Sequence, residues 1–196
     1  MNFKMSASMR LSSAALGMVL LLSMQARADE AALLQGARTL ATDVPANLSK
    51  VLMDEVAKDG VVSAVGVCKD KAPEMAKAAS AKSGWGIRRV SLNNRNPKAV
   101  PDAWERAALE DFDRRAAAGE DAATLEKYAT VETESRKEFR YMKALPVKKP
   151  CLACHGVVET IKPEVIEKIK ALYPDDKATG YSLNQIRGAI TLRKAE

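Results

Sequence analysis

Residues 151–155 read Cys151-Leu152-Ala153-Cys154-His155, and the interpretation of the whole chain starts from them. Two cysteines separated by two residues and followed directly by a histidine form the attachment pattern of c-type haem. In that pattern both thiols bond covalently to the haem and the imidazole ligates the iron. His155 is the only histidine of the chain, so no second imidazole is available for the other axial position. We therefore expect one haem c, bound covalently through Cys151 and Cys154, with His155 as the proximal iron ligand.

Two other uses of a C-x-x-C pair fit the sequence less well. A structural zinc site needs four ligands, and outside the motif only Cys68 remains among the usual soft ones. A redox dithiol of the thioredoxin type needs a strand–helix–strand pattern around it, and the flanking residues do not show one. The pattern therefore favours haem over both.

The first 28 residues have the three parts of a secretory signal peptide. They begin with a basic segment, residues 11–24 are apolar or small, and Ala26-Arg27-Ala28 is a small-x-small cleavage site. The apolar run is shorter than the roughly 20 residues that span a bilayer. We expect cleavage after Ala28, no membrane anchor afterwards, and a single haem-binding domain over residues 29–196. Because c-type haem is attached after export, we expect a periplasmic location and haem-maturation machinery as a partner.

The charge of the mature chain does not indicate a nucleic-acid partner. The full chain has 31 Lys and Arg against 25 Asp and Glu, a net charge of +6. Lys4, Arg10 and Arg27 leave with the signal peptide, so 28 basic residues face 25 acidic ones, a net +3. Two haem propionates would reduce this to about +1, too little to favour nucleic acid. A redox or signalling protein is the partner we expect.

The first half of the mature chain is predicted to be helical. Residues 31–58 are rich in Ala, Leu and charged residues, with Pro45 as a kink. After Gly60, apolar residues recur at steps of four and three, which is the spacing of one helix face. These are Val61, Val65, Cys68, Ala72, Met75 and Ala79. Pro73 removes a backbone hydrogen bond, so we expect the helix to bend or restart there.

Beyond Gly84 the pattern predicts strands that alternate with helices. Asp102 and Glu105 have capping-box spacing and open a helix, and another helix begins at Pro163. Strands are expected at residues 85–92, 128–132, 138–145 and 186–192. This order predicts an α+β domain with an antiparallel sheet.

Cys68 is left without a disulfide partner, because the haem consumes the other two cysteines. An unpaired exported thiol is either a small buried apolar residue or an iron ligand opposite His155. Three methionines compete with it as the second ligand, and spacing alone does not choose among them. They are Met53, Met75 and Met142.

An ordered set of motifs across residues 32–193 resembles one protein family. The motifs include Val67-Cys68-Lys69, Gly84-Trp85, Arg95-Asn96-Pro97, Phe139-Arg140-Tyr141, Cys151-Leu152-Ala153-Cys154-His155-Gly156, Tyr173-Pro174-Asp175 and Arg187-Gly188-Ala189. Together they resemble the single-haem c-type cytochrome domain that occurs alone as an exported protein or as the sensor part of bacterial signalling proteins. The resemblance implies a PAS-like antiparallel sheet flanked by helices, with a long N-terminal helical segment. It also implies iron held by His155 and by a distal cysteine, here Cys68.

Three classes of function remain to be compared. The resemblance favours a haem protein that senses redox state or a diatomic gas. Periplasmic electron transfer is the alternative, and it favours ligands that stay constant in both oxidation states. A haem enzyme needs an acid–base group beside an open distal face. The chain has no second histidine, and its carboxylates show no diagnostic spacing, so we do not expect an enzyme.

Arg88, Arg89 and Arg140 are our candidates for contacts to the haem propionates. A guanidinium group can donate paired hydrogen bonds to a carboxylate. Neighbouring residues of a strand point to opposite faces, so at most one of Arg88 and Arg89 is expected to face the haem.

Haem should remain bound to the denatured chain. When the protein is produced with a c-type maturation system, acid–acetone extraction should leave one haem per chain, because thioether bonds survive unfolding. His155→Ala should keep the attachment but change the ferric absorption spectrum, because the proximal ligand is lost. Haem that can be extracted from the unaltered protein would contradict the prediction.

Overall fold

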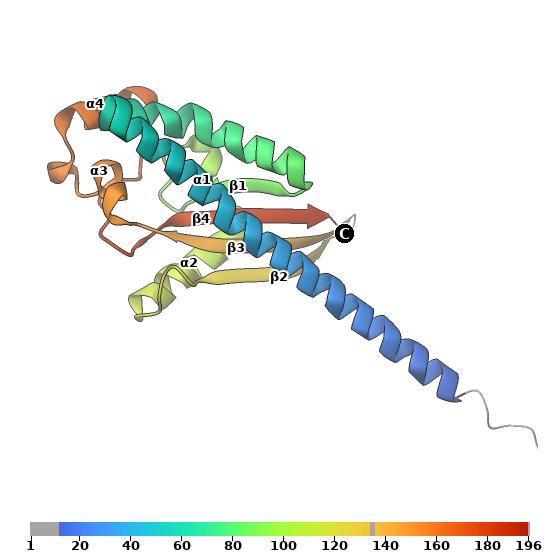
Figure 1. Ribbon diagram of the computed structural model, residues 1–196. Helices are drawn as coiled ribbons and strands as arrows, with labels where there is room; N and C mark the ends of the chain where they lie inside the picture. The colour runs from blue at the N-terminus through green and yellow to red at the C-terminus, as the bar shows by residue number, and fades with distance from the viewer. Residues whose placement is uncertain (1–11, 134–135, 196) are drawn as a thin grey trace, which may run out of the picture. The chain divides into compact units, whose positions relative to one another are not determined.

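A computed structural model of the chain describes residues 12–133 and 136–195 (Figure 1). The chain divides into two compact units, Met1–Gly36 and Ala37–Glu196. Helix α1 (Ser12–Ser83) begins in the first unit, and the second unit holds the rest of α1 and the whole sheet. Residues 1–11 of the expected signal peptide lie outside the described residues, and the cleavage site stays a prediction. Within the described ranges, no helix is long and apolar enough to cross a membrane.

Helix α1 is interrupted at Gly60 and not at a proline. Gly60 has φ 82° and ψ 174°, a conformation that glycine adopts without steric cost. Pro45 and Pro73 both lie inside the helix. The chain therefore does not restart at Pro73, and the helical stripe that begins at Val61 follows directly after the break.

Four antiparallel strands form one sheet with the order β1-β4-β3-β2. The strands are β1 (Gly86–Val90), β2 (Glu126–Thr133), β3 (Arg136–Pro146) and β4 (Ile186–Ala195). Each contains or overlaps a strand predicted from the sequence. The α+β expectation is confirmed: helices flank an antiparallel sheet, and a long helix precedes it.

Helix α2 (Ala103–Ala117) covers one face of this sheet. Leu109 and Phe112 pack there against Val90, Met142 and Ala189 in one buried cluster. Two shorter helices, α3 (Leu152–His155) and α4 (Pro163–Leu172), follow the third strand.

The opposite face of the sheet lies against α1. Phe139 and Tyr141 on this face have no exposed surface. Ser80 accepts a hydrogen bond from the Ile87 amide at 3.0 Å, which fixes the end of α1 to β1.

At Gly188 in β4 the alternation of side chains between the two faces of the sheet is inverted. The register with β3 shifts at the Leu145/Pro146 position, and Gly188 has φ 152°. A Cβ atom there would collide with the carbonyl oxygen of Val90. Across this bulge the alternation of side chains is inverted, because Ile186 and Ala189 both pack on the α2 face. Arg187 is thereby turned to the α1 face.

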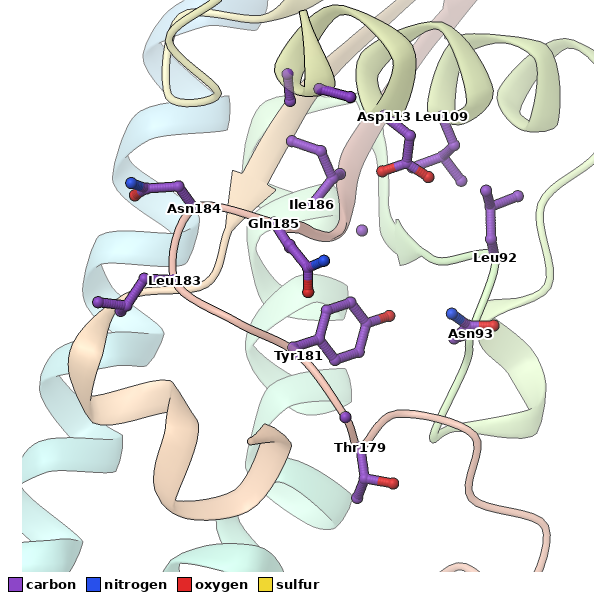
Figure 2. A pocket seen from close by; sticks show the side chains of 14 residues that line it. Leu92, Asn93, Leu109, Asp113, Thr179, Tyr181, Leu183, Asn184, Gln185 and Ile186 are labelled. Carbon is purple, nitrogen blue, oxygen red and sulfur yellow. The ribbon is translucent and has the colours of Figure 1, made fainter. Parts of the chain in front are cut away.

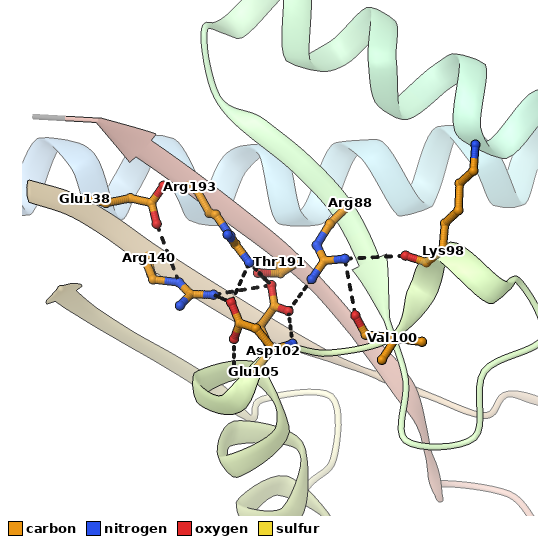
Figure 3. Close-up of polar contacts among 9 residues, drawn as sticks. All are labelled: Arg88, Lys98, Val100, Asp102, Glu105, Glu138, Arg140, Thr191 and Arg193. Atoms are coloured by element: carbon orange, nitrogen blue, oxygen red, sulfur yellow. Dashed lines mark hydrogen bonds and ion pairs between the residues drawn. The ribbon is translucent and has the colours of Figure 1, made fainter. Parts of the chain in front are cut away.

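The capping box of α2 carries a buried cluster of charges (Figure 3). Glu105 has no exposed surface, and Thr191 and Arg193 donate hydrogen bonds to it at 3.0 and 2.8 Å. Arg88 also donates to Glu105. Burial acts to raise the pKa of Glu105, but the hydrogen bonds from Arg193 and the Asp102 amide outweigh it and hold that pKa below its usual range.

Arg140 belongs to the same cluster. It donates to Asp102 at 2.6 Å and lies with its guanidinium carbon 4.6 Å from the centre of the Trp104 ring. This charge cluster therefore joins α2 to three strands: β1, β3 and β4.

Glu105→Gln should lower the free energy of unfolding by about 3 kcal/mol, because the buried Arg140 and the partly buried Arg88 and Arg193 lose an anionic partner. Since the folded-state pKa of Glu105 lies below its unfolded value, its contribution is complete above the unfolded pKa of about 4.3 and is lost as the pH falls through the folded pKa. The free energy of unfolding, measured with urea from pH 7 to pH 3, should therefore decrease less steeply for the variant. Glu110→Gln, on the exposed side of α2, is the control and should change stability by less than about 0.5 kcal/mol. Equal losses for both variants would contradict the prediction.

Candidate functional site

The five-residue motif lies on a short helical turn that presents its cysteines three residues apart. Cys151 ends a 3-10 turn (Lys149–Cys151) and is the N-cap of α3, which ends at His155. At Gly156 an added Cβ would lie 2.7 Å from the carbonyl oxygen of Leu152, so a larger residue would disturb the turn. All three cysteines of the chain are unpaired and half-buried.

His155 is held as a neutral imidazole with one defined tautomer. Its Nδ1 lies 2.7 Å from the carbonyl oxygen of Ala178. A carbonyl can only accept, so Nδ1 carries the proton, and the 3.2 Å contact from Arg187 Nε to Nδ1 is then not a hydrogen bond. Burial, with the positive charges of Arg187 and Arg95, lowers the pKa of His155 to about 2. Among the described residues, none hydrogen-bonds Nε2, which keeps its lone pair for a metal.

The Ala178 carbonyl, which accepts the hydrogen bond of His155, lies in a loop that is fixed by a buried ion pair. Arg95 donates to Asp176 at 2.9 and 3.0 Å and to the carbonyl of Cys154 at 2.7 Å. Asp176 in turn accepts from the amide of Ala178 at 3.0 Å. One arginine therefore connects the haem motif to the loop that orients its histidine.

A second set of contacts ties the same loop to the end of the motif. The Tyr181 amide donates to the carbonyl of His155 at 2.9 Å, and the Gly180 amide donates to Gly156 at 2.8 Å. The Tyr181 ring meets the His155 ring edge-on with centroids 6.5 Å apart. His155 is thus held both by contacts of its ring and by hydrogen bonds of its backbone.

Cys68 lies in the same region as the motif. The preceding turns of α1 pack on α4, where Val65, Val165 and Ile169 form a buried cluster that Cys154 also contacts. Burial raises the pKa of the Cys68 thiol, and the positive charges of Arg89, Arg95 and Arg187 act in the opposite direction. Cys68 stands three residues after Val65 on α1, so the structure places Cys68 near the motif.

The competing methionines are less favourably placed. Met142 is fully buried among the α2-face residues, away from the motif. Met53 is 38% exposed on α1. Met75 is half-buried, seven residues after Cys68 on the same helix, and it remains the alternative among the three. Among the described residues, no three side chains of His, Cys, Asp or Glu gather as ligands of one metal ion.

The three arginines expected at the propionates separate onto two faces of the sheet. Arg88 and Arg140 bind Glu105 and Asp102 under α2, so the structure does not bring them to the motif. Arg89 points to the other face, where its charge acts on Cys68 and His155. The alternation of a strand accounts for the difference between Arg88 and Arg89.

Arg95 and Arg187 are site residues that the sequence reasoning did not single out. Both stand in the motifs that carried the family resemblance, and that was the available signal. Arg187 donates to Ser91 Oγ at 2.9 Å and to the Asn93 carbonyl at 3.2 Å. No carboxylate among the described residues pairs with it. Burial, with the charge of Arg89, lowers the pKa of Arg187 to about 10.

We call the set Cys68, Arg89, Arg95, Cys151, Cys154, His155, Asp176 and Arg187 the motif cluster. It holds three guanidinium groups and a single carboxylate, that of Asp176. Arg89 is exposed, whereas Arg187 is half-buried and no carboxylate among the described residues pairs with it. Such a half-buried cation is costly unless an anion joins it. The donor set therefore fits haem, which would bring two propionates, and the free thiols and the neutral imidazole fit its attachment and ligation.

Comparisons with known proteins give one family and one solved structure. A family model described as Tll0287-like matches residues 19–194. The crystal structure of the cyanobacterial heme-protein Tll0287 is similar with a TM-score of 0.53 and 27% sequence identity. The match covers 64% of this chain and 70% of that one. No curated protein matched the chain.

Arg95 and Asp176 should be strongly coupled in stability. Their side chains are only 7% and 10% exposed, so Arg95→Met or Asp176→Leu alone should each cost about 3 kcal/mol by leaving a buried charge unpaired. The double variant should lose clearly less than the sum of the two, as urea unfolding can measure. The exposed pair Arg115–Glu120 is the control, for which coupling should stay below about 1 kcal/mol. Additive losses at Arg95 and Asp176 would contradict the prediction.

Proposed function

Because this chain belongs to the Tll0287-like family, we propose that it is an exported monohaem c-type cytochrome that senses redox state or a diatomic gas. The observation that carries the proposal is the state of His155. Its Nδ1 proton is committed to Ala178 at 2.7 Å, and its Nε2 is left free of described partners. This is the form in which histidine binds metals. The heme-protein description of the similar cyanobacterial structure supports the same cofactor.

Haem would supply an iron that changes oxidation state. We propose that Cys151 and Cys154 attach the group covalently and that His155 is the proximal ligand. The Ala178 carbonyl orients the imidazole and increases its basicity. Arg95 keeps that carbonyl in place through its ion pair with Asp176 at 2.9 Å.

Arg89 and Arg187 are the residues that we propose for the propionates. Arg95 is already paired with Asp176, and Arg88 and Arg140 are paired under α2. Arg187 has no carboxylate partner among the described residues, although it is half-buried. Two carboxylates beside these arginines would compensate the charge of the motif cluster.

Cys68 is the residue that we propose as distal ligand. The way in which it is held favours a sensor over a protein whose ligands stay constant. His155 is held through its ring and its carbonyl. In the part of the chain that the structure describes, no residue hydrogen-bonds the Cys68 thiol. A ligand held by fewer contacts is the one expected to exchange when the iron changes state, which is what a sensor requires.

Electron transfer is the second candidate, and exposure near the motif favours it. Cys151 and Cys154 are half-buried, so the edge of an attached group would lie near the surface. Lys148 and Lys149 beside the motif are exposed and could receive an acidic redox partner. We do not propose an enzyme, since the one carboxylate of the motif cluster, Asp176, is engaged by Arg95.

Cys68→Ser should change the electron paramagnetic resonance spectrum of the ferric protein. The unaltered protein should give the narrow low-spin g-spread of a thiolate opposite a histidine, and the variant should become high-spin or take another sixth ligand. Met75→Leu is the matched control on the same helix and should leave the spectrum as it is. A spectrum that responds to Met75→Leu but not to Cys68→Ser would assign the ligand to Met75.

Carbon monoxide added to the dithionite-reduced protein separates the two candidate functions. Ready binding would favour a sensor with an exchangeable ligand. An iron that stays six-coordinate in both oxidation states and excludes the gas would favour electron transfer.

A further inference from the structure

A pocket lies beside the motif cluster, between α2 and the loop that leads into β4 (Figure 2). Its volume is about 520 Å³, which suits a small organic molecule. Leu92, Leu109 and Ile186 supply apolar walls, and Asp113 and Tyr181 supply polar groups. None of the cysteines and neither ring nitrogen of His155 belongs to this lining.

Asp113 has a carboxylate without a cation. It lies one helical turn after Leu109, on the face of α2 that borders the pocket. The neighbouring arginines are already used, because Arg114 pairs with Asp111 and Arg115 pairs with Glu120 at 2.8 Å. No ion pair or hydrogen bond to Asp113 exists among the described residues. Asp113 is exposed on the side of α2 that borders the pocket. Partial desolvation and the charge of Glu110 raise its pKa, as expected for a carboxyl that lacks a counter-ion.

Tyr181 has a hydroxyl without a partner. The residue is only 8% exposed, and its ring is fixed between His155, edge-on at 6.5 Å, and the guanidinium of Arg187 at 5.6 Å. Figure 2 shows the hydroxyl directed across the pocket towards Asn93. Within the described part of the chain it makes no hydrogen bond. The hydroxyl itself is not enclosed by protein. It opens to the pocket, where it is available to hydrogen-bond a group that enters.

We propose that this pocket binds a small organic ammonium ion, with a primary amine carried on an apolar body. The amine would donate to the Asp113 carboxylate, and such charge-assisted hydrogen bonds are stronger than neutral ones. The body would pack against Leu92, Leu109 and Ile186, and a polar group on it would reach the Tyr181 hydroxyl. An anion is disfavoured, because the pocket lining contains no Lys or Arg.

The site also has a direct connection to the motif cluster. Tyr181 lines the pocket, and its backbone amide donates to the His155 carbonyl at 2.9 Å. Occupancy of the pocket therefore acts on a residue that contacts the imidazole. The binding proposal itself does not depend on haem, since no lining residue is used for attachment or ligation.

Tyramine is a suitable probe, because it carries a primary amine and a hydroxyl on an aromatic ring. Isothermal titration of the haem-loaded protein at pH 7 should show saturable one-to-one binding. Asp113→Asn should weaken binding at least about tenfold, since the charge that the amine needs is gone. Tyr181→Phe, which keeps the ring and deletes the hydroxyl, should weaken binding by a smaller factor. Ethylphenol, which lacks the amine, should bind at least about tenfold more weakly than tyramine.

Glu164→Gln is the control, because it removes one exposed carboxylate of α4 outside the pocket and should leave tyramine binding unchanged. Circular dichroism of each variant checks that it is folded. The proposal is overturned if tyramine does not bind saturably, or if Asp113→Asn binds it as well as the unaltered protein. The haem spectrum of the same samples reports separately on the proposed function, so a failure of one is distinguishable from a failure of the other.

Discussion

The hydrogen bond from His155 Nδ1 to the Ala178 carbonyl, 2.7 Å long, is the contact on which the arrangement of the site depends. It sets which nitrogen of the ring is free, and it requires the loop around Ala178 to stay in place. That loop is held by Arg95, which reaches Asp176 and the Cys154 carbonyl together. Three segments far apart in the chain therefore have to be correctly packed before one imidazole is usable as a ligand.

The protein has two groups of charged side chains, and they differ in how many arginines are paired with carboxylates. Under α2, three arginines meet three carboxylates, those of Asp102, Glu105 and Glu138. In the motif cluster, Arg95 alone pairs with a carboxylate, that of Asp176. Arg89 and Arg187 have no ion pair among the described residues. The first group joins elements of the fold, whereas the second keeps positive charge available for an anionic partner. The neighbouring residues Arg88 and Arg89 of β1 belong to different groups: Arg88 to the one under α2 and Arg89 to the motif cluster.

Features that depend on neighbours in the sequence were predictable. The capping box of Asp102 and Glu105 is present with both hydrogen bonds, and the four strands lie where alternation and turn residues indicated. The complete burial of Glu105 was not predictable, because it results from arginines on strands that are distant in the sequence. The roles of Arg95 and Arg187 were missed for the same reason. At Pro73 a bend or a restart of the helix was expected. The helix does not restart there, and its break lies at Gly60 instead.

The bulge at Gly188 has a consequence for how this chain can vary. Arg187 reaches the histidine only because the backbone inverts its alternation at the next residue, where a Cβ would strike the carbonyl oxygen of Val90. A residue without a side chain thus decides the direction of its charged neighbour. Substitutions at position 188 should therefore be tolerated poorly, because an added Cβ has no room beside the Val90 carbonyl. In a protein engineered on this scaffold, Gly188 and Arg187 would have to be transplanted as a pair.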